Sequence, residues 1–460
     1  MRLRRAPVTR AAAAARGVGD DGDVPDIPRR GAARTAKLAS LPLGFAGRTA
    51  AGWGKRLAGQ TSEQISADMS AKTAEQLFSV LGELKGGAMK FGQALSVFEA
   101  AVPEELAEPY REALTKLQSG APPMPASTVH RVLAEQLGTG WRGRFTSFDD
   151  TPAASASIGQ VHRAVWGDGR EVAVKVQYPG ADEALRSDLK QVQRFSRLFQ
   201  AVAPGLEIKP LIVELRDRMV EELDYRAEAD NQRAFAAAFD GDPEFLVPKV
   251  VASAPKVVVS EWVDGVKLAT VISSGEQAQR NEVGRKLSVF HFSSPARAGL
   301  LHSDPHPGNF LVAPDGRLIV LDFGAVARLP KGMPPTLGRM SMLALEDRPA
   351  ELFDLMREAS FVRPGIEMDP HAVLAYLAPF VEPMRGDSFH FTRRWLQGQA
   401  NRFGDARGPE MEMARSMNLP AEYLLIYRVT MGSIAILCQL DAEIPFWGIV
   451  RDWQPGIRED

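Results

Sequence analysis

The chain has 460 residues, with 55 basic and 57 acidic side chains and a formal net charge of −2. This length suits one two-lobed catalytic unit with extensions, and the near balance of charge gives no chain-wide basic footprint for nucleic acid. The single cysteine, Cys438, excludes an intramolecular disulfide framework and a cysteine-based zinc site, and it suits a reducing compartment. We therefore expect an intracellular protein without a nucleic-acid partner.

Residues 1–60 differ from the rest of the chain because Arg, Ala, Gly and Pro dominate and the acids are confined to residues 20–26. This composition predicts a basic, largely disordered lead-in, with a solvated tail as the favoured interpretation. A transit peptide is the alternative, but the acids interrupt it and a GC-rich bacterial source explains the composition as well. The basic residues also suit an anionic membrane surface, at about 1 kcal/mol for each well-placed Lys or Arg.

Residues 61–147 form a predicted helical extension. A capping-box spacing at Thr61 to Gln64 begins a helix that runs to Phe98, and further helices are expected at Pro103 to Leu117 and at Ala126 to Leu137. Three glycines, at positions 86, 87 and 92, lie within the segment from Leu84 to Gln93 of the first helix. Each costs roughly 1 kcal/mol relative to Ala, so we expect another group to approach this helix closely.

Residues 148–263 have the pattern of a β-rich lobe. Two strands are predicted around a Gly-Asp-Gly turn at residues 167–169, and the second contains Lys175 in Val-Ala-Val-Lys, close to the Val-Ala-Ile-Lys of kinase strand three. A loop of small residues precedes the first strand, and we expect its backbone N–H groups to meet a phosphate; it comprises Ala154, Ser155, Ala156, Ser157 and Ile158.

Lys175 needs a carboxylate to orient it toward phosphates. The predicted helix at residues 210–239 carries several acids between Glu221 and Glu228, and the spacing alone does not decide which of them pairs with Lys175. The turn at Val263 to Gly265 is a plausible hinge between this lobe and residues 264–460, which we expect to be mainly helical.

The stretch from Leu301 to Gly324 places an acid, an amide and a second acid around a predicted hairpin. Asp304 and Asn309 have the five-residue spacing of a kinase-like catalytic loop, and Asp322 follows the hairpin within Asp-Phe-Gly. Mg²⁺ prefers oxygen ligands, so Asn309 and Asp322 are the predicted metal ligands, and Asp304 is predicted to face the phosphoryl acceptor.

Two other features of residues 264–460 have simple explanations. His302 and His306 are four positions apart, but the prolines at 305 and 307 forbid a regular helix and neither Cys nor a third His lies nearby, so zinc is not expected. The apolar stretch from Val429 to Leu440 has 12 residues, against about 20 for a spanning helix, and is predicted to be a buried helix.

Taken together, these motifs resemble the UbiB/AarF family of atypical, protein-kinase-like proteins, from about Ala71 to about Pro330. The most specific match is Lys90-Phe91-Gly92-Gln93, the K-x-G-Q motif of the added helix. Glu222-Leu223-Asp224 matches the E-x-D motif, and residues 154–157 match the Ala-rich loop that replaces the kinase Gly-rich loop.

The resemblance implies an α+β, bilobal kinase-like fold with a β-rich N-lobe, a helical C-lobe and an added N-terminal helical extension. It implies ATP or ADP with Mg²⁺, and a role in isoprenoid quinone biosynthesis or lipid handling at a membrane surface. Lys90 would block the site where a protein substrate binds, Glu222 would pair with Lys175, and Asp224 would help to hold the added helix. The expected location is the cytoplasm, with peripheral attachment to the inner face of a membrane.

Two departures and two alternatives accompany this interpretation. Ser155 interrupts the run of alanines, and the catalytic loop reads His-Ser-Asp where ordinary kinases have His-Arg-Asp, so control through a phosphorylated activation loop is not expected. An aminoglycoside-type phosphotransferase shares the His-x-Asp loop and the downstream metal-binding Asp. A nucleotide-sensing, lipid-binding pseudokinase keeps the same fold and metal ligands.

Overall fold

The computed structural model describes residues 123–156, 158–183, 223–404 and 408–458. The predictions for the lead-in, for the helix that carries Lys90 and for the helix at Pro103 to Leu117 lie outside the described residues, as do Ser157 and Glu222. The third predicted helix is described: α5 spans Ala126–Leu137, as the pattern indicated.

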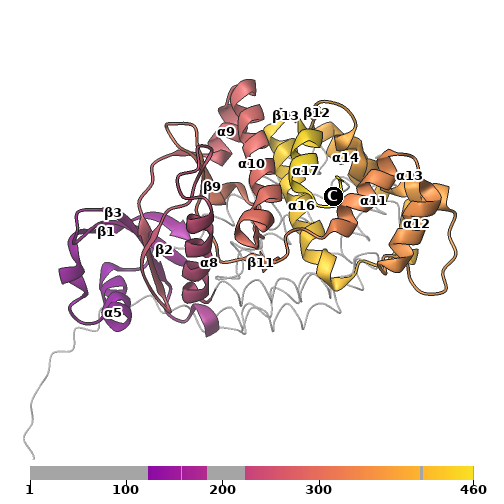
Figure 1. Cartoon of the computed structure of the whole chain (residues 1–460). Coiled ribbons are helices and arrows are strands. Elements are labelled where there is room, and N and C mark those ends of the chain that lie inside the picture. Colours follow the sequence, from indigo (N-terminus) through magenta and orange to yellow (C-terminus); the bar gives the residue numbers. More distant parts are fainter. Residues whose placement is uncertain (1–122, 157, 184–222, 405–407, 459–460) are drawn as a thin grey trace, which may run out of the picture.

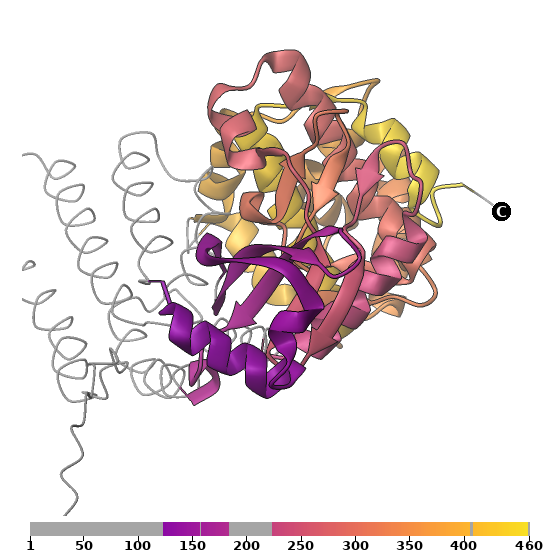
Figure 2. The ribbon, with the colours of Figure 1, turned by 90° about the vertical axis from the view of Figure 1, so that its left-hand side faces the viewer.

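The N-lobe is built on a five-stranded sheet with the order β1-β2-β3-β6-β5. Its strands are β1 (Phe145–Ala156), β2 (Gly159–Trp166), β3 (Glu171–Gln177), β5 (Val250–Ala254) and β6 (Val257–Glu261), and the 3₁₀ helix η2 (Trp141–Arg144) leads into β1. Alternate side chains point to opposite faces of a strand, so Val172, Val174 and Val176 lie on one face of β3. Helix α5 packs on that face and joins these valines in one core, in the foreground of Figure 2.

Helix α8 (Tyr225–Ala238) contacts β5 and β6 (Figure 1). It begins at Asp224, whose side chain accepts hydrogen bonds from the backbone N–H groups of Arg226 and Ala227. Such a cap satisfies donors that the first helical turn leaves without partners. Tyr225 and Ala229 are buried in one small cluster with Ile158 and Val258. The cap therefore fixes which side chains of α8 face the sheet.

Short strands join the two lobes. They are β4 (Phe245–Leu246), β7 (Val266–Lys267), β9 (Phe310–Val312) and β10 (Leu318–Val320), in the order β4-β10-β9-β7, and the separate pair β8 (Leu300–His302) and β11 (Val326–Arg328). The predicted hairpin is confirmed, because β9 and β10 are antiparallel with Val312 opposite Leu318. Gly316 turns the chain between them with a φ of 87°, in the left-handed region that favours glycine.

The C-lobe is helical. Its main core gathers around α10 (Gln277–Ala298), with α9 (Leu268–Ser274), α16 (Ala421–Leu440) and α17 (Phe446–Trp453). A second core lies between α11 (Pro335–Leu345), α12 (Pro349–Glu358) and α13 (Pro370–Val381). The remaining elements are η3 (Pro307–Asn309), η4 (Glu382–Met384), β12 (Phe389–His390), α14 (Arg393–Gly404), α15 (Pro409–Ser416) and β13 (Glu443–Ile444). The α+β, two-lobed prediction is thus confirmed.

Helix α16 is longer than the apolar stretch predicted from the sequence. Within the described part of the chain it is the one helix long and apolar enough, by length and composition, to cross a membrane. Of that window, Glu422–Leu440, 61% is buried inside the protein, which is also how the core helix of a C-lobe behaves. Val429, Ile436 and Cys438 all lie in the main core, and burial raises the pKa of the Cys438 thiol to about 12.

Two further observations concern the outline of the protein. The predicted boundary between residues 147 and 148 falls inside β1, and α5 shares its core with the sheet. The division of the chain into domains stays a prediction.

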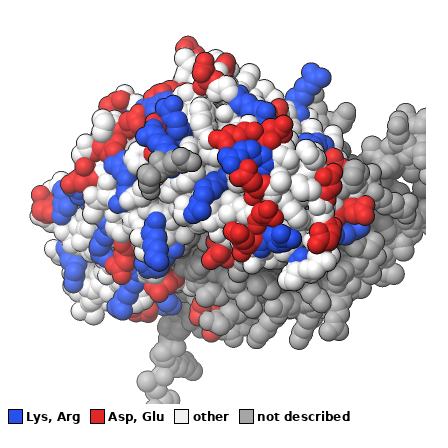
Figure 3. Space-filling view, turned by 45° about the vertical axis from the view of Figure 1, so that its right-hand side comes forward, with Lys and Arg blue, Asp and Glu red and all other residues white. Residues whose placement is uncertain are grey.

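On the face in Figure 3, Lys and Arg are interspersed with Asp and Glu over the described residues. This mixture agrees with the small net charge of −2.

Candidate active site

Lys175 lies where the two lobes meet. Its Nζ donates to Glu228 Oε1 at 2.6 Å and to Asp322 Oδ2 at 3.3 Å, and it lies 5.0 Å from the centre of the Tyr225 ring. The Lys175 side chain is 17% exposed and that of Glu228 only 4%. Burial alone lowers the pKa of Lys175, but the carboxylates of Asp322 and Glu228 hold this pKa well above its usual range. Lys175 is therefore charged and links α8 to the segment after β10.

Among the described residues, the α8 carboxylate that contacts Lys175 is that of Glu228, and the pairing with Glu222 that the family resemblance implied stays a prediction. Glu222 lies outside the described residues, and Asp224, expected to hold the added helix, caps α8. Because the helix begins after Asp224, Glu228 lies in its first turn and on its buried face, with Tyr225, Ala229 and Gln232. The sequence carried this signal as an Asp cap followed by residues at helical spacing, and motif matching passed over it.

The loop of small residues forms a tight hairpin between β1 and β2. Ala154 pairs with Val161, Ser155 with Gln160, and Ala156 with Gly159. The side chains of Ala154 and Ser155 are exposed. The Ile158 side chain is buried in the cluster with Tyr225, and its carbonyl accepts from Tyr178 N at 2.9 Å. The contact of its backbone N–H with a phosphate stays a prediction. Ile158 thus anchors the hairpin.

Gly159 lets the hairpin approach β3 and α8. A Cβ atom at this position would lie 2.4 Å from the Val176 carbonyl oxygen and 2.8 Å from the Tyr225 hydroxyl. Real Cβ atoms do not come so close to other atoms, so only glycine fits without a shift of the backbone. The hairpin and Lys175 are consequently held against the same tyrosine.

The catalytic-loop residues that the sequence predicted are brought together. Asn309 Nδ2 donates to the Asp304 main-chain oxygen at 3.0 Å and to Asp304 Oδ2 at 3.1 Å. Both residues are 7% exposed. The five-residue spacing therefore closes a loop in which the amide fixes the carboxylate.

Asp322 is oriented by its own backbone. Its Oδ1 accepts from Gly324 N at 2.9 Å, and its main-chain oxygen accepts from His302 Nε2 at 2.5 Å. The next residue, Phe323, is fully buried, with its ring 5.7 Å from that of His302. His306 Nδ1 accepts from Gly308 N at 3.0 Å. The two histidines therefore support the loop.

The oxygen donors suit Mg²⁺ held together with a nucleotide. Asn309 uses Nδ2 on Asp304, which leaves its amide oxygen as the donor to a cation, and Asp322 supplies a carboxylate. Within the described residues, no group of three or more His, Cys, Asp or Glu side chains could hold a metal ion. Mg²⁺ normally takes one or two protein ligands and completes its shell with water and phosphate oxygens, so this sparse set fits it.

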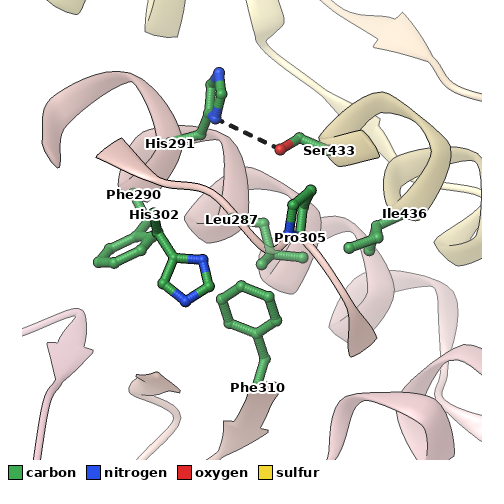
Figure 4. A pocket seen from close by; sticks show the side chains of 8 residues that line it. All are labelled: Leu287, Phe290, His291, His302, Pro305, Phe310, Ser433 and Ile436. Atoms are coloured by element: carbon green, nitrogen blue, oxygen red, sulfur yellow. Dashed lines mark hydrogen bonds between the residues drawn. The ribbon is translucent and has the colours of Figure 1, made fainter. Parts of the chain in front are cut away.

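A cavity lies behind the catalytic loop (Figure 4). It is lined by Leu287, Phe290, His291, His302, Pro305, Phe310, Ser433 and Ile436. His291 is buried there, with Nε2 3.1 Å from the Thr430 hydroxyl and Nδ1 3.5 Å from that of Ser433. Burial, with a smaller effect of His302, lowers the pKa of His291 to about 4, so its ring is neutral at pH 7.

Comparisons with known proteins agree with this geometry. Atypical kinase COQ8B, mitochondrial, of Danio rerio is 30% identical over 313 residues, which cover 66% of this chain and 50% of the relative. Atypical kinase COQ8, mitochondrial, of Saccharomyces cerevisiae is 30% identical over 306 residues, which cover 65% and 60%. The chain spans about half the length of the first curated relatives that it matches.

A solved structure is similar over most of the chain. The complex of Rv3197 with erythromycin, from Mycobacterium tuberculosis, has a TM-score of 0.66 and 51% sequence identity, and the match covers 87% of this chain and 100% of that chain. The ABC1 atypical kinase-like domain matches residues 116–349, about half of the sequence. The kinase-like resemblance predicted from the sequence is confirmed, and the chain belongs to the family of ABC1 atypical kinase-like domains.

Proposed function

We propose that this protein is a Mg²⁺-dependent, ATP-binding atypical kinase or ATPase that supports isoprenoid quinone biosynthesis or related lipid metabolism at a membrane surface. The observation that supports this most strongly is the contact of one lysine with a carboxylate on α8 and with the Asp of Asp-Phe-Gly, at 2.6 and 3.3 Å. Kinase-like enzymes position nucleotide phosphates with this lysine and this pair of acids.

The residues divide the work of holding a nucleotide. Lys175, kept charged by Glu228 and Asp322, contacts the α- and β-phosphates, while the β1–β2 hairpin presents backbone N–H groups near Ala154 and Ser155. Asn309 and Asp322 hold the metal through their side-chain oxygens. Mg²⁺, when bound, neutralises the charge that develops on the transferred phosphoryl group.

Asp304 orients the attacking hydroxyl, which belongs either to an acceptor or to water. Asp304 is 7% exposed as a residue, and Asn309 Nδ2 fixes its carboxylate at 3.1 Å. In this proposal Lys90 restricts the approach of a large acceptor, which favours ATP hydrolysis or a small lipid substrate over protein phosphorylation.

The test uses the full chain with Mg-ATP, with and without liposomes that contain anionic phospholipid. We expect slow ATP turnover that liposomes stimulate, and a loss of at least about a hundredfold in Asp304→Asn, on the scale of removing a group that acts in the transition state. Replacing Lys90 by Ala should release autophosphorylation. Nucleotide binding without turnover above background, with or without liposomes, would favour the lipid-binding pseudokinase, and unchanged quinone precursors in cells lacking the gene would count against the quinone role.

A second candidate function is the binding or phosphorylation of a macrolide antibiotic. The specific observation in its favour is that a protein 51% identical to this chain was solved as a complex with erythromycin. Calorimetric titration with erythromycin, followed by an assay for a phosphorylated macrolide, separates the candidates. Robust phosphorylation by the unmodified protein would replace the first proposal, whereas binding alone would leave the catalytic assignment intact.

A further inference from the structure

The face of the N-lobe sheet opposite Lys175 carries a buried polar pair in β2. Gln160 is 1% exposed and His162 is not exposed at all, although both lie in an otherwise apolar core covered by α5. Neither takes part in the function proposed above. Buried polar groups of this kind cost stability unless each finds its partner, so the partners show what the pair holds together.

Gln160 grips the main chain of Met124, just before α5. Met124 N donates to Gln160 Oε1 at 2.7 Å, and Gln160 Nε2 donates to the Met124 carbonyl oxygen at 3.4 Å. One side-chain amide thus satisfies both the N–H and the carbonyl oxygen of Met124, as a backbone partner would do in a sheet. Met124 follows residues 1–122 in the sequence, and these include Lys90.

His162 contacts both the side-chain amide of Gln160 and the main chain of β1, the strand that leads into the β1–β2 hairpin. Gln160 Nε2 lies 2.8 Å from His162 Nε2, and His162 Nδ1 lies 2.8 Å from the Asp149 carbonyl oxygen. That carbonyl lies where the pairing of β1 with β2 shifts, between Phe148 and Pro152. A bulge leaves backbone groups without ladder partners, and His162 supplies one here.

The hydrogen bonds specify one protonation state of His162. Nδ1 must donate to the carbonyl, so Nε2 must accept from the Gln160 amide. If Nε2 also carried a proton, Gln160 would have to turn its oxygen toward His162 and its NH₂ toward Met124 N, where two donors would meet. Protonation of His162 therefore breaks the hydrogen bond from Met124 N to Gln160 Oε1.

We propose that Gln160 and His162 are positioning residues that fasten the chain before α5 to the β1–β2 hairpin. We propose further that these hydrogen bonds break when His162 becomes protonated. The hairpin begins directly beside them, because Ser155 is opposite Gln160 and Ala156 is opposite Gly159. The proposal goes beyond the function above, and only its nucleotide readout rests on that function.

The surroundings of His162 set the pH range. Burial lowers the pKa of His162 below its usual value, the nearby carboxylates of Asp150 and Asp149 on β1 oppose this, and His130 on α5 reinforces it. The aromatic ring of Phe148 stacks on the imidazole at 5.1 Å. The fastening is therefore complete above the unfolded-state pKa of about 6.5 and weakens as pH falls below that value.

The first experiment uses the unmodified full chain. Nitrogen NMR of the histidines should show His162 as the neutral Nδ1–H tautomer, titrating below pH 6.5. Hydrogen exchange at the Met124 amide, corrected for its intrinsic pH dependence, should accelerate as pH falls from 7 to 5. An Nε2–H tautomer, or an exchange rate at Met124 independent of pH, would overturn the proposal even if no variant folds.

Two substitutions sharpen the result. Gln160→Met removes both contacts to Met124, so exchange there should rise up to about tenfold at pH 7, the range for one net hydrogen bond. Gln160→Glu offers oxygens to both Met124 N and a protonated His162, so its protection should instead increase as pH falls. Gln136→Met on α5 is the matched control, because Gln136 accepts from Lys256 N at 3.1 Å rather than from Met124, and it should keep the wild-type response.

The nucleotide readout separates this proposal from the proposed function. With Gln160→Met, the KM for Mg-ATP should rise severalfold while kcat stays close to that of the wild type. Faster exchange at Met124 with an unchanged KM would overturn the positioning of the hairpin. Absence of Mg-ATP binding by the wild type would instead contradict the proposed function, and the exchange and NMR results would still stand on their own.

Discussion

The ionisable groups on the two sides of the catalytic loop differ in charge: the lysine toward the N-lobe is charged, and the histidine toward α16 is neutral. Toward the N-lobe, Lys175 stays charged because the carboxylates of Glu228 and Asp322 both lie within 3.3 Å of its Nζ. Toward α16, His291 has hydroxyl partners and no counter-charge, and burial keeps it neutral at pH 7. Desolvation acts on both sides, so the difference comes from the partners.

This contrast suits the roles that the two sides have in the proposed function. In the proposed function the charged side exchanges some of its internal contacts for contacts with a polyphosphate and a metal ion. The neutral side, with Leu287, Phe290 and Ile436 around its cavity, forms an apolar support for the loop. Substitutions on the charged side should therefore lower stability at pH 7 and Mg-ATP affinity, whereas substitutions on the neutral side should change the stability alone.

The largest change in stability is expected for Lys175→Met. It removes the cation 2.6 Å from a carboxylate that is only 4% exposed, and breaking such a buried pair costs roughly 3 kcal/mol or more. Denaturant unfolding should show this loss, and adding Glu228→Gln should restore part of it. Lys249→Met, which breaks the 2.7 Å contact to Asp240 on the exposed surface, is the matched control and should change little.

If the Lys175→Met protein were as stable as the Lys249→Met control, the contact between Lys175 and the buried carboxylate of Glu228 would not stabilise the folded protein.

The neutral side should appear as a loss of stability in acid. The pKa of His291 is about 4 in the folded protein and about 6.5 when unfolded, so the unfolded state binds the proton more readily between these values. Stability should fall as pH drops below 6.5, by on the order of 3 kcal/mol in total once pH is below 4.

A variant identifies the residue responsible. His291→Leu should flatten the part of the stability–pH curve that depends on this ring. Equal slopes for wild type and His291→Leu would show that the ring is not held neutral.

A smaller effect is expected for Thr430→Val. It keeps the shape of the side chain but removes the hydroxyl 3.1 Å from His291 Nε2, and a lost hydrogen bond to a buried group costs about 1–2 kcal/mol. Thermal unfolding at pH 7 should detect this loss, with Mg-ATP affinity unchanged. A fall in affinity instead would mean that the two sides of the loop are coupled.

The sequence predicted the linear motifs well because their spacing imposes local geometry. The five residues from Asp304 to Asn309 close one loop, and alternation in β3 places Lys175 opposite the buried valines. The hairpin between β9 and β10 followed from its turn. In each case the distance along the chain limits the distance in space.

Contacts between distant segments were harder to predict. Lys175 and Glu228 are 53 positions apart, and which acid meets the lysine depends on where α8 begins and how it rotates against the sheet. The motif match favoured Glu222, which lies outside the described residues, and within them the α8 acid that contacts Lys175 is Glu228. The buried pair of Gln160 and His162 gave no sequence signal, because polar residues within a strand read as one exposed face.

The most direct test of the account is calorimetric titration of Mg-ATP into wild type, Asp322→Asn and Asp315→Asn. Asp315 is the matched control, since it lies in the turn before β10, is exposed and contacts Arg317 at 2.8 Å. We predict Mg²⁺-dependent binding by wild type and Asp315→Asn, and its loss in Asp322→Asn. Equal Mg²⁺-dependent affinity in all three proteins would contradict the assignment of this site.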